Sequence, residues 1–403
     1  MDRSEAGERK VAILTHALKG GGAERVISNL SGHIGGDYEL TLLLLDSDGS
    51  DRKDGVRTVS IWSRSFPEVS DHGLPFNPIH LIQMMVSLRR EVKRNGFSMV
   101  LSFLEIPNFL NLMTFGKHRR IVSVRNHMSG KRKGFLGNLA VRFVTIFTYH
   151  TIAVSAMCRL DLIEGFGADP ERVSVLPNPV DLEMIDRLRE EGLADCPIPD
   201  GVPVIVNVAR LTEAKGHDRL IQSFCRVRET IPDARLVLVG DGDMKERLMG
   251  MTRNLGVDEH VIFAGFQKNP YRFIQRSDVF VLSSHYEGFP NALLEALACG
   301  VPVISTDCLS GPRELLSPNT DPSSVAKGIE HADYGILVPP WGNDIADLDN
   351  ERTMAEAIVR LLSDDDLRNL YISRGRERVS DFAAPNVRIV WDEFIKEHIK
   401  DGV

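Results

Sequence analysis

The chain is poor in cysteine, and its cysteines show none of the patterns that support a structural role. Its 403 residues include five cysteines, an odd number, scattered without a CxxC pair: Cys158, Cys196, Cys225, Cys299 and Cys308. This distribution argues against a disulfide framework and against a structural zinc site. It is typical of a protein from a reducing compartment, so we expect a cytoplasmic location.

Long apolar runs are also missing. No stretch of eighteen consecutive apolar residues occurs, so no membrane-spanning helix is predicted. Residues 1–10 are mostly polar and lack the apolar core of a signal peptide. With 43% hydrophobic and 26% charged residues, the composition is that of an ordinary globular protein. The length is sufficient for two domains with separate cores.

Acidic residues are absent from one long window, although the whole chain carries a net charge of -8. Between Ile106 and Leu160 there is no Asp or Glu, and the basic residues there are Lys117, Arg119, Arg120, Arg125, Lys131, Arg132, Lys133, Arg142 and Arg159. The basic region 117–142 predicts peripheral attachment to an anionic membrane surface at its cytoplasmic face. A buried helix with a basic rim is the alternative. Nucleic acid is not an expected partner, because the chain is acidic and has no nucleic-acid motif.

Strand-like apolar runs alternate with helix-length segments twice along the chain. The first series extends from residues 10–15 to 173–176, and the second from 203–208 to 335–338. This alternation predicts two doubly wound parallel sheets, and therefore two Rossmann-like domains that face one another. The segment 192–203, rich in Pro and Gly, predicts the boundary. Residues 317–333, with two prolines and many polar residues, predict a loop.

Two carboxylates, Glu287 and Glu295, stand eight residues apart in a strand-turn-helix segment. The apolar run 279–284 predicts a strand buried on both faces, and Glu295 falls inside the helix that follows. At about 100° per residue, eight residues return close to the same side of a helix, so both carboxylates can face one ligand. The spacing alone is weak evidence, because Glu183 and Glu191 have the same separation in a segment typical of a solvated helix.

The turn between the two carboxylates predicts an anion site. Gly288 permits a sharp turn, Pro290 suits a first helical turn, and the unpaired N–H groups there can bind a phosphate. A phosphate would lie close to Glu287, whereas Glu295 would accept hydrogen bonds from hydroxyl groups. The segment therefore predicts a sugar-nucleotide site made by Glu287, Gly288, Phe289, Pro290, Asn291, Ala292 and Glu295.

Two cations, Arg210 and Lys215, share the loop that follows the strand 203–208. In open α/β sheets ligands bind at the carboxyl ends of strands, and two positive charges are what a departing diphosphate requires. Ordinary surface charges are the alternative. The glycines of the loop after the first strand, Gly21 and Gly22 among them, allow a phosphate or sugar to approach the backbone closely.

A dinucleotide site is the rival interpretation of this glycine-rich loop. Gly20 and Gly22, with Asp46 after the second strand, imitate the dinucleotide fingerprint. Arg25, however, occupies the third small-residue position, where its side chain would obstruct close helix packing. An NAD-dependent oxidoreductase is therefore disfavoured.

The segment 287–295, with Ser310-Gly-Pro-Arg-Glu-Leu315 downstream, resembles the E-x7-E signature of retaining GT-B glycosyltransferases, family 4 (group 1). Residues 210–216 are similar to the diphosphate-binding segment of that family, and the likeness covers nearly the whole chain. It implies a GT-B fold, in which two Rossmann-like domains face across a cleft. Residues 1–191 would bind the acceptor, residues 204–384 would bind the nucleotide sugar, and residues 385–403 would form a helix that crosses back to the first domain.

The resemblance also implies a reaction. One hexose or N-acetylhexosamine would move, with retention, from a nucleotide-diphosphate sugar to a hydroxyl of a lipid-linked glycan or glycolipid in polysaccharide or lipopolysaccharide assembly. A UDP-sugar is the favoured donor, and GDP-mannose is the alternative. Catalytic roles are implied for Glu287, Arg210, Lys215 and His127, and Phe266 would border the nucleobase. No metal and no cofactor would be required. A non-catalytic nucleotide-sugar-binding subunit is the alternative, and the intact Arg210, Lys215, Glu287 and Glu295 argue against it.

Overall fold

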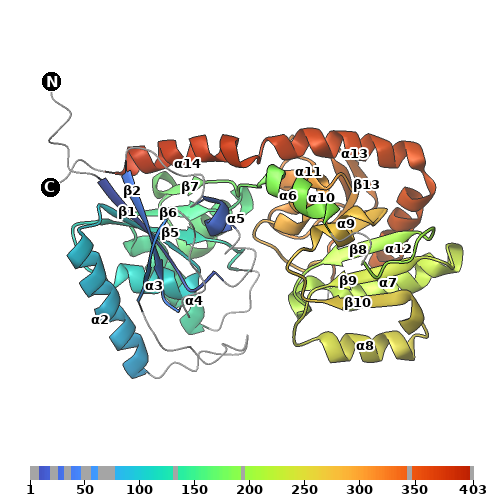
Figure 1. The fold of residues 1–403 in the computed structure, drawn as a ribbon, viewed down its shortest axis with the longest axis horizontal. Helices are drawn as coiled ribbons and strands as arrows, with labels where there is room; N and C mark the ends of the chain where they lie inside the picture. Colours follow the sequence, from blue (N-terminus) through green and yellow to red (C-terminus); the bar gives the residue numbers. More distant parts are fainter. Residues whose placement is uncertain are drawn as a thin grey trace. The chain divides into compact units, whose positions relative to one another are not determined.

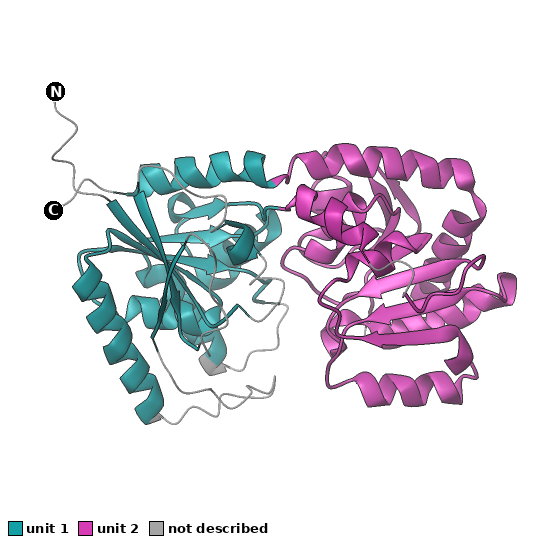
Figure 2. Ribbon diagram, viewed as in Figure 1, with its two compact units in different colours: residues 1–179, 384–403 teal, residues 180–383 magenta. Residues whose placement is uncertain are grey.

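The computed structural model describes residues 9–18, 26–30, 38–46, 56–61, 78–129, 135–191, 196–342 and 347–399. The chain forms two compact units (Figure 2). Unit 1 comprises residues 1–179 and 384–403, and unit 2 comprises residues 180–383. Each unit is built on a seven-stranded sheet with helices around it (Figure 1). The predicted pair of Rossmann-like α/β sheets is therefore confirmed.

The sheet of unit 1 has the order β3-β2-β1-β4-β5-β6-β7, and all its neighbouring strands are parallel. Its strands are β1 (Arg9–Thr15), β2 (Tyr38–Leu44), β3 (Arg57–Ser60), β4 (Met99–Phe103), β5 (Arg119–Val124), β6 (His150–Ala153) and β7 (Val173–Val175). Within its described residues, the helical segments of this unit are residues 26–30, α2 (Pro78–Asn95), α3 (Glu105–Leu112), α4 (Phe135–Phe147), α5 (Ala156–Leu160), η1 (Asp161–Gly165), η2 (Pro170–Arg172) and α14 (Ala384–His398).

Both faces of this sheet are buried, because successive side chains of a strand point to opposite faces. In β1, Val11 and Ile13 join one core with the helical residues 26–30 and α14, while Ala12 and Leu14 join a second core with α2. Helix α14 belongs to this unit although it is the last element of the chain. Its Trp391 is fully buried, and the indole N–H donates to the Pro177 carbonyl over 3.0 Å.

The sheet of unit 2 has the order β10-β9-β8-β11-β12-β14-β13. Its strands are β8 (Val204–Val208), β9 (Arg235–Val239), β10 (Val261–Gly265), β11 (Val279–Leu282), β12 (Val303–Thr306), β13 (Glu330–Ala332) and β14 (Gly335–Val338). Its helices and helical turns are α6 (Leu182–Glu190), η4 (Glu213–Lys215), α7 (His217–Thr230), α8 (Lys245–Asn254), η5 (Asp258–His260), α9 (Tyr271–Gln275), α10 (Asn291–Ala298), α11 (Pro312–Leu316), α12 (Asp347–Ser363) and α13 (Asp365–Ser380).

Every residue of β8 and β11 is buried because helices cover both faces of this sheet. Val206 and Phe280 belong to the core that contains residues of α10 and α11, whereas Ile205 and Val281 belong to the core with α7 and α12. The turns that leave the carboxyl ends of β8 and β11 are thus carried by strands fixed on both sides.

The division between the units differs from the boundary expected at residues 192–203. Residues 180–191 belong to unit 2, because α6 packs against α9 and α10 and Ile185 is buried in the unit 2 core. The backbone N–H of Val180 donates to the Phe382 carbonyl over 2.8 Å. The two points at which the chain passes between the units therefore lie side by side.

One predicted loop contains a strand. Within residues 317–333, Glu330–Ala332 forms β13, which pairs antiparallel with β14 at the edge of the sheet. The prediction of a continuous loop was wrong because this short strand lacks the apolar run that marks the buried strands. Among the helices of the described ranges, none is long and apolar enough to cross a membrane.

Candidate active site

The loops that follow β8 and β11 meet at one edge of the unit 2 sheet. The two strands are parallel neighbours, so their carboxyl ends lie together. The backbone N–H of His285 donates to the Ala214 carbonyl over 2.9 Å, and the Ser283 hydroxyl donates to the Lys215 carbonyl over 2.8 Å. The segment that carries Lys215 is therefore bonded directly to the segment that carries Glu287.

Lys215 and Glu287 form an ion pair at this junction. The Lys215 Nζ lies 2.6 Å from Glu287 Oε1, and the same oxygen accepts a hydrogen bond from the Ser284 hydroxyl, also over 2.6 Å. The Glu287 residue is only 8% exposed, whereas the Lys215 side chain is 26% exposed. The ammonium group is thus held at the edge of the site and still reaches solvent, where an anion can approach it.

Gly216 allows Lys215 to occupy this position. Its φ of 59° lies in the left-handed region, and a Cβ there would be 2.1 Å from the Ser283 carbonyl oxygen. That carbonyl also accepts a hydrogen bond from the Trp341 indole N–H. Only glycine combines this backbone conformation with so close an approach to another strand end.

The residue after this glycine, His217, anchors the start of α7. Its Nε2 lies 3.0 Å from Asn207 Oδ1, and the Asn207 amide donates to the Val281 carbonyl over 2.8 Å. Burial, and next the positive charge of Lys215, lower the pKa of His217 to about 3. The imidazole is therefore neutral at physiological pH, and this buried chain of hydrogen bonds ties β8, β11 and α7 together beneath Lys215.

The helix α10 begins directly after the Glu287 loop. Pro290 is its N-cap residue, Asn291 is its first residue, and Leu293 and Leu294 are fully buried in the core. Glu295 is 6% exposed, and its carbonyl accepts a hydrogen bond from the Cys299 N–H over 3.0 Å. Burial, and next the Glu295 carboxylate, raise the pKa of the Cys299 thiol to about 12. The N–H groups of Asn291 and Ala292 lie in the first turn, which has no side-chain cap.

Arg210 and Phe266 stand at the same edge of the sheet, on the loops after β8 and β10. Arg210 is exposed, and the loop that carries it is fixed by the N–H of Leu211, which donates to the Asp241 carbonyl over 2.9 Å. Phe266 is 61% exposed. Across the ranges that the structure describes, no cluster of three or more His, Cys, Asp or Glu side chains is arranged to hold a metal ion.

His127 belongs to unit 1, in the loop after β5, and is buried. Its Nδ1 lies 3.8 Å from Asp161 Oδ2 in η1, a π-helical turn. The same carboxylate oxygen accepts hydrogen bonds from the backbone N–H groups of Met128, over 2.6 Å, and Ser129, over 3.1 Å. Asp161 therefore holds the loop that carries His127. Gly21 and Gly22 lie outside the described residues.

Two family models match consecutive parts of the chain. The model described as glycosyl transferases group 1 matches residues 189–378, and the model described as glycosyltransferase family 4 matches residues 20–184. An uncharacterised glycosyltransferase of Methanocaldococcus jannaschii is 36% identical over 290 residues, which cover 68% of this chain and 71% of that protein. The chain belongs to the group 1, family 4 glycosyltransferases.

A second relative of this glycosyltransferase matches almost from end to end. It is the Campylobacter jejuni N-acetylgalactosamine-N,N'-diacetylbacillosaminyl-diphospho-undecaprenol 4-alpha-N-acetylgalactosaminyltransferase, 28% identical over 93% of this chain and 96% of that protein. The crystal structure of Anabaena HepE in complex with UDP and glucose has the same fold. Its TM-score is 0.75 at 18% identity, with 96% of this chain and 100% of that chain covered. The fold of the glycosyltransferase is GT-B, as predicted.

Sequence reasoning placed the two cations and Glu287 of this glycosyltransferase on loops that the structure brings together. It did not identify Ser284, which binds Glu287, or Asp161, which holds the His127 loop. Ser284 could have been suspected as a polar residue directly after a buried strand. Asp161 could not, because α4, β6 and α5 separate it from His127 in the chain.

Proposed function

We propose that this glycosyltransferase moves a hexose or N-acetylhexosamine, with retention and without a metal, from a nucleotide diphosphate sugar to a hydroxyl group. A UDP-sugar is favoured as the donor, and GDP-mannose is the alternative. The acceptor proposed is a lipid-linked glycan or glycolipid in surface polysaccharide assembly. The observation that carries the proposal is the Lys215–Glu287 pair beside the start of α10, which brings together a cation, a carboxylate and the first turn of a helix.

The leaving diphosphate gains negative charge as the glycosidic bond breaks, and this charge must be stabilised. Arg210 and Lys215 supply two cations on one loop, and the first turn of α10 supplies backbone N–H groups with the positive end of a helix dipole. These groups are the proposed substitute for a metal ion. Lys215 would exchange its bond to Glu287 for one to a phosphate oxygen, which leaves the Glu287 carboxylate able to accept from the sugar.

The carboxylates are assigned to hydroxyl groups, because a carboxylate accepts hydrogen bonds and repels phosphate. Glu287, next to Lys215, would bind hydroxyls of the transferred sugar. Glu295, within α10, would bind the ribose, and the backbone around Phe266 would contact the nucleobase. In unit 1, His127 is proposed to contact the sugar that is transferred, with Asp161 as the residue that positions its loop.

The nucleotide site is tested by thermal stabilisation with UDP, GDP, ADP and NAD, each with excess chelator. A ligand present at a hundred times its Kd adds about 2.7 kcal/mol to the free energy of unfolding. UDP is expected to raise the melting temperature of the wild type, and Arg210→Ala is expected to lose most of that shift. His127→Ala should keep it, because His127 is assigned to the sugar. A melting-temperature shift with NAD alone would overturn the proposal. Equal shifts with UDP for wild type and Arg210→Ala would show that Arg210 does not bind the nucleotide.

A lipid-linked acceptor is proposed partly because the relative from Campylobacter is named for a diphospho-undecaprenol substrate. The surface of unit 1 gives independent support. Helix α4 buries Val141 and Val144 but exposes an apolar row at i, i+4, i+7 and i+8, made by Leu139 (53% exposed), Phe143 (37%), Ile146 (44%) and Phe147 (60%). Because this row is accessible, α4 is not the fully buried helix of the alternative interpretation.

Basic side chains accompany the exposed apolar ones. Arg142 is exposed on α4, and α2 exposes Ile79, Ile82 and Val86 in its first half and Arg89, Arg90, Lys93 and Arg94 in its second. Helix α3 contacts both α2 and α4, so the three helices lie on one face of the sheet (Figure 1). Lys131, Arg132 and Lys133 of the predicted basic region lie outside the described residues.

Not every basic residue between Ile106 and Leu160 belongs to this surface. Arg125 donates to Asn178, and burial lowers its pKa to about 10. Arg159 donates to the carbonyls of Val173 and Pro170. These two arginines hold loops of unit 1 together. The membrane surface that we propose therefore consists of the exposed faces of α2 and α4, with anionic lipid as its partner.

Vesicle sedimentation tests this surface. The double variant Phe143→Glu, Phe147→Glu is expected to bind phosphatidylglycerol vesicles at least about tenfold more weakly than wild type, because each buried Phe contributes about 1.5–3 kcal/mol. Leu255→Glu is the matched control, since Leu255 is 45% exposed on unit 2 and should have no effect. Equal vesicle binding by all three proteins would show that α4 is not part of the membrane-binding surface.

A further inference from the structure

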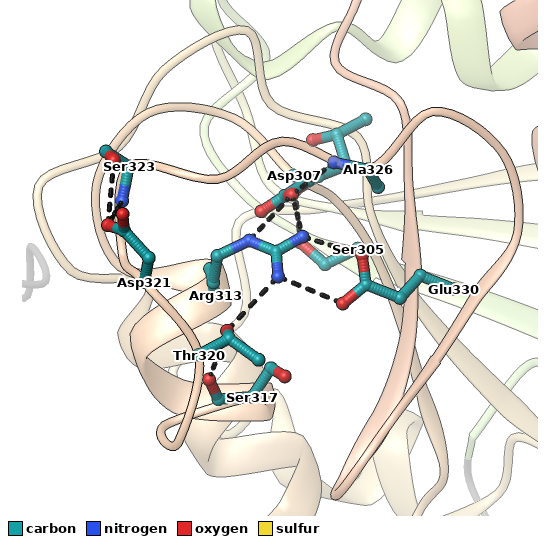
Figure 3. A network of polar contacts seen from close by, with 10 residues as sticks. Ser305, Asp307, Arg313, Ser317, Thr320, Asp321, Ser323, Ala326 and Glu330 are labelled. Atoms are coloured by element: carbon teal, nitrogen blue, oxygen red, sulfur yellow. Dashed lines mark hydrogen bonds and ion pairs between the residues drawn. The ribbon is translucent and has the colours of Figure 1, made fainter.

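A buried ionic network lies in unit 2 beside the proposed donor site, and no residue of it has a role so far (Figure 3). Its centre is Arg313, at the start of α11, which is 5% exposed. The guanidinium binds Asp307, directly after β12, and Glu330, in β13. Asp307 is 3% exposed and also accepts from the Ala326 N–H over 2.7 Å. One side chain thus joins three segments of the chain.

The guanidinium uses all five of its N–H donors in this network. Nε donates to Asp307 over 3.0 Å, and Nη2 donates to Asp307 and, over 2.8 Å, to Glu330. Nη1 donates to Glu330 over 2.9 Å and to the Thr320 hydroxyl over 3.2 Å. A lysine would preserve the charge but not the planar fork that these bonds need. The network is therefore specific for arginine.

The Asp307–Arg313 pair closes the base of a short turn. At the tip, Ser310 has a φ of 74° and Gly311 a φ of 100°, so two successive residues adopt left-handed conformations. Such a conformation is uncommon for a residue with a side chain, and it persists only where the surroundings hold it. The closed base of the turn supplies that restraint.

The tip of this turn packs on the donor loop. The Ser310 hydroxyl donates to the Gly288 carbonyl over 2.7 Å. A Cβ on Gly311 would be 2.4 Å from Pro290 Cδ and 3.0 Å from Phe289 Cα, so the two backbones are in close contact. Gly288 and Pro290 form the turn that leads from Glu287 into α10. A displacement of the tip would displace that turn.

We propose that Arg313 is a positioning residue for the donor site. Through Asp307 it sets the turn 307–313, the turn holds Gly288–Pro290 in place, and that placement orients Glu287 and the first N–H groups of α10 toward the diphosphate. The inference rests on the proposed function, since it assumes that these groups bind the nucleotide. It adds residues 307, 310 and 313 to the set that determines donor affinity, although none of them is assigned a contact with the donor.

The test compares the Kd for UDP, measured by calorimetry on the full chain, with the melting temperature of each variant. Arg313→Lys is expected to raise the Kd for UDP about tenfold, and Asp307→Asn to act similarly. Ser310→Ala removes the hydrogen bond from the Ser310 hydroxyl to the Gly288 carbonyl and leaves the charges intact. It is expected to raise the Kd about threefold with little change in melting temperature.

The control is a second ion pair, with a buried carboxylate and a partly exposed arginine, on the opposite face of the same sheet. Arg219 Nη1 lies 2.8 Å from Glu351 Oε1, and Glu351 is 2% exposed, but the pair joins α7 to α12 and not the donor loop. Arg219→Lys should lower the melting temperature and leave the Kd for UDP within about twofold of wild type. A purely structural role for Arg313 would give the same result in Arg313→Lys.

The outcomes separate this inference from the proposed function. If wild type binds UDP and Arg313→Lys and Ser310→Ala bind it equally well, the inference is wrong and the proposed function stands. If wild type binds none of UDP, GDP and ADP, the proposed function fails and the inference fails with it. If Arg313→Lys does not fold, Ser310→Ala decides, because that variant leaves the network complete.

Discussion

Replacing Glu287 with alanine is expected to lower kcat for sugar transfer by about a thousandfold while the protein remains folded. The loss of one group that acts on charge or orientation in a transition state typically costs a factor of 10²–10³. Here the substitution removes both the proposed acceptor for the sugar hydroxyls and the partner that holds the Lys215 ammonium at 2.6 Å. The measurement is the rate of nucleotide release with donor and acceptor present.

The fold should tolerate this change because the ion pair is not fully enclosed. Breaking a completely buried pair costs about 3–5 kcal/mol, since it leaves a charge without solvent. The Lys215 side chain is 26% exposed, so water can solvate its ammonium, and we expect a loss of about 1–2 kcal/mol. Circular dichroism and the melting temperature measure this loss.

The chain contains a matched control for Glu287. Glu183 and Glu191 have the same spacing as Glu287 and Glu295, but Glu183 is exposed on α6. Glu183→Ala is expected to leave kcat unchanged. Turnover near the wild-type value in Glu287→Ala would show that the carboxylate has no part in transfer, whatever its place in the fold.

The substitution Gly216→Ala is expected to destabilise unit 2 and to displace Lys215. A left-handed conformation costs a residue with a Cβ about 1–2 kcal/mol. At this position the new Cβ would also meet the Ser283 carbonyl oxygen at 2.1 Å, and the forced shift should cost about 1–3 kcal/mol more. For a unit of this size each kcal/mol lowers the melting temperature by about 2–4 °C. We expect kcat to fall at least about tenfold, because Lys215 moves with the backbone.

Gly256→Ala isolates the contribution of crowding. Gly256 has a φ of 67°, close to the 59° of Gly216, but nothing lies within 4 Å of a Cβ built there. This variant should show only the conformational cost and retain full activity. If the two substitutions lowered the melting temperature and the activity by equal amounts, close packing against Ser283 would not be the reason for glycine at position 216.

The candidate site was predictable where its residues follow an apolar run within a few positions. Arg210 and Lys215 follow β8, and Glu287 follows β11, so a local pattern sufficed to place each on a loop at the carboxyl end of a strand. The two-sheet GT-B architecture was also predictable from local patterns, because strand-like apolar runs and helix-length segments alternate along the sequence. Strand β13 was missed because three residues with a charged first position carry no such pattern.

By itself, then, the amino-acid sequence determined the family, the two sheets and the loops that carry the proposed catalytic groups. The tertiary structure alone decided which of those groups touch. Lys215 and Glu287 are 72 residues apart and meet because β8 and β11 are neighbours in the sheet. Asp161 meets the His127 loop, and Arg313 joins Asp307 to Glu330, by the same kind of long-range placement. Local periodicity encodes which face of an element is buried, but strand order and packing bring distant side chains within hydrogen-bonding distance.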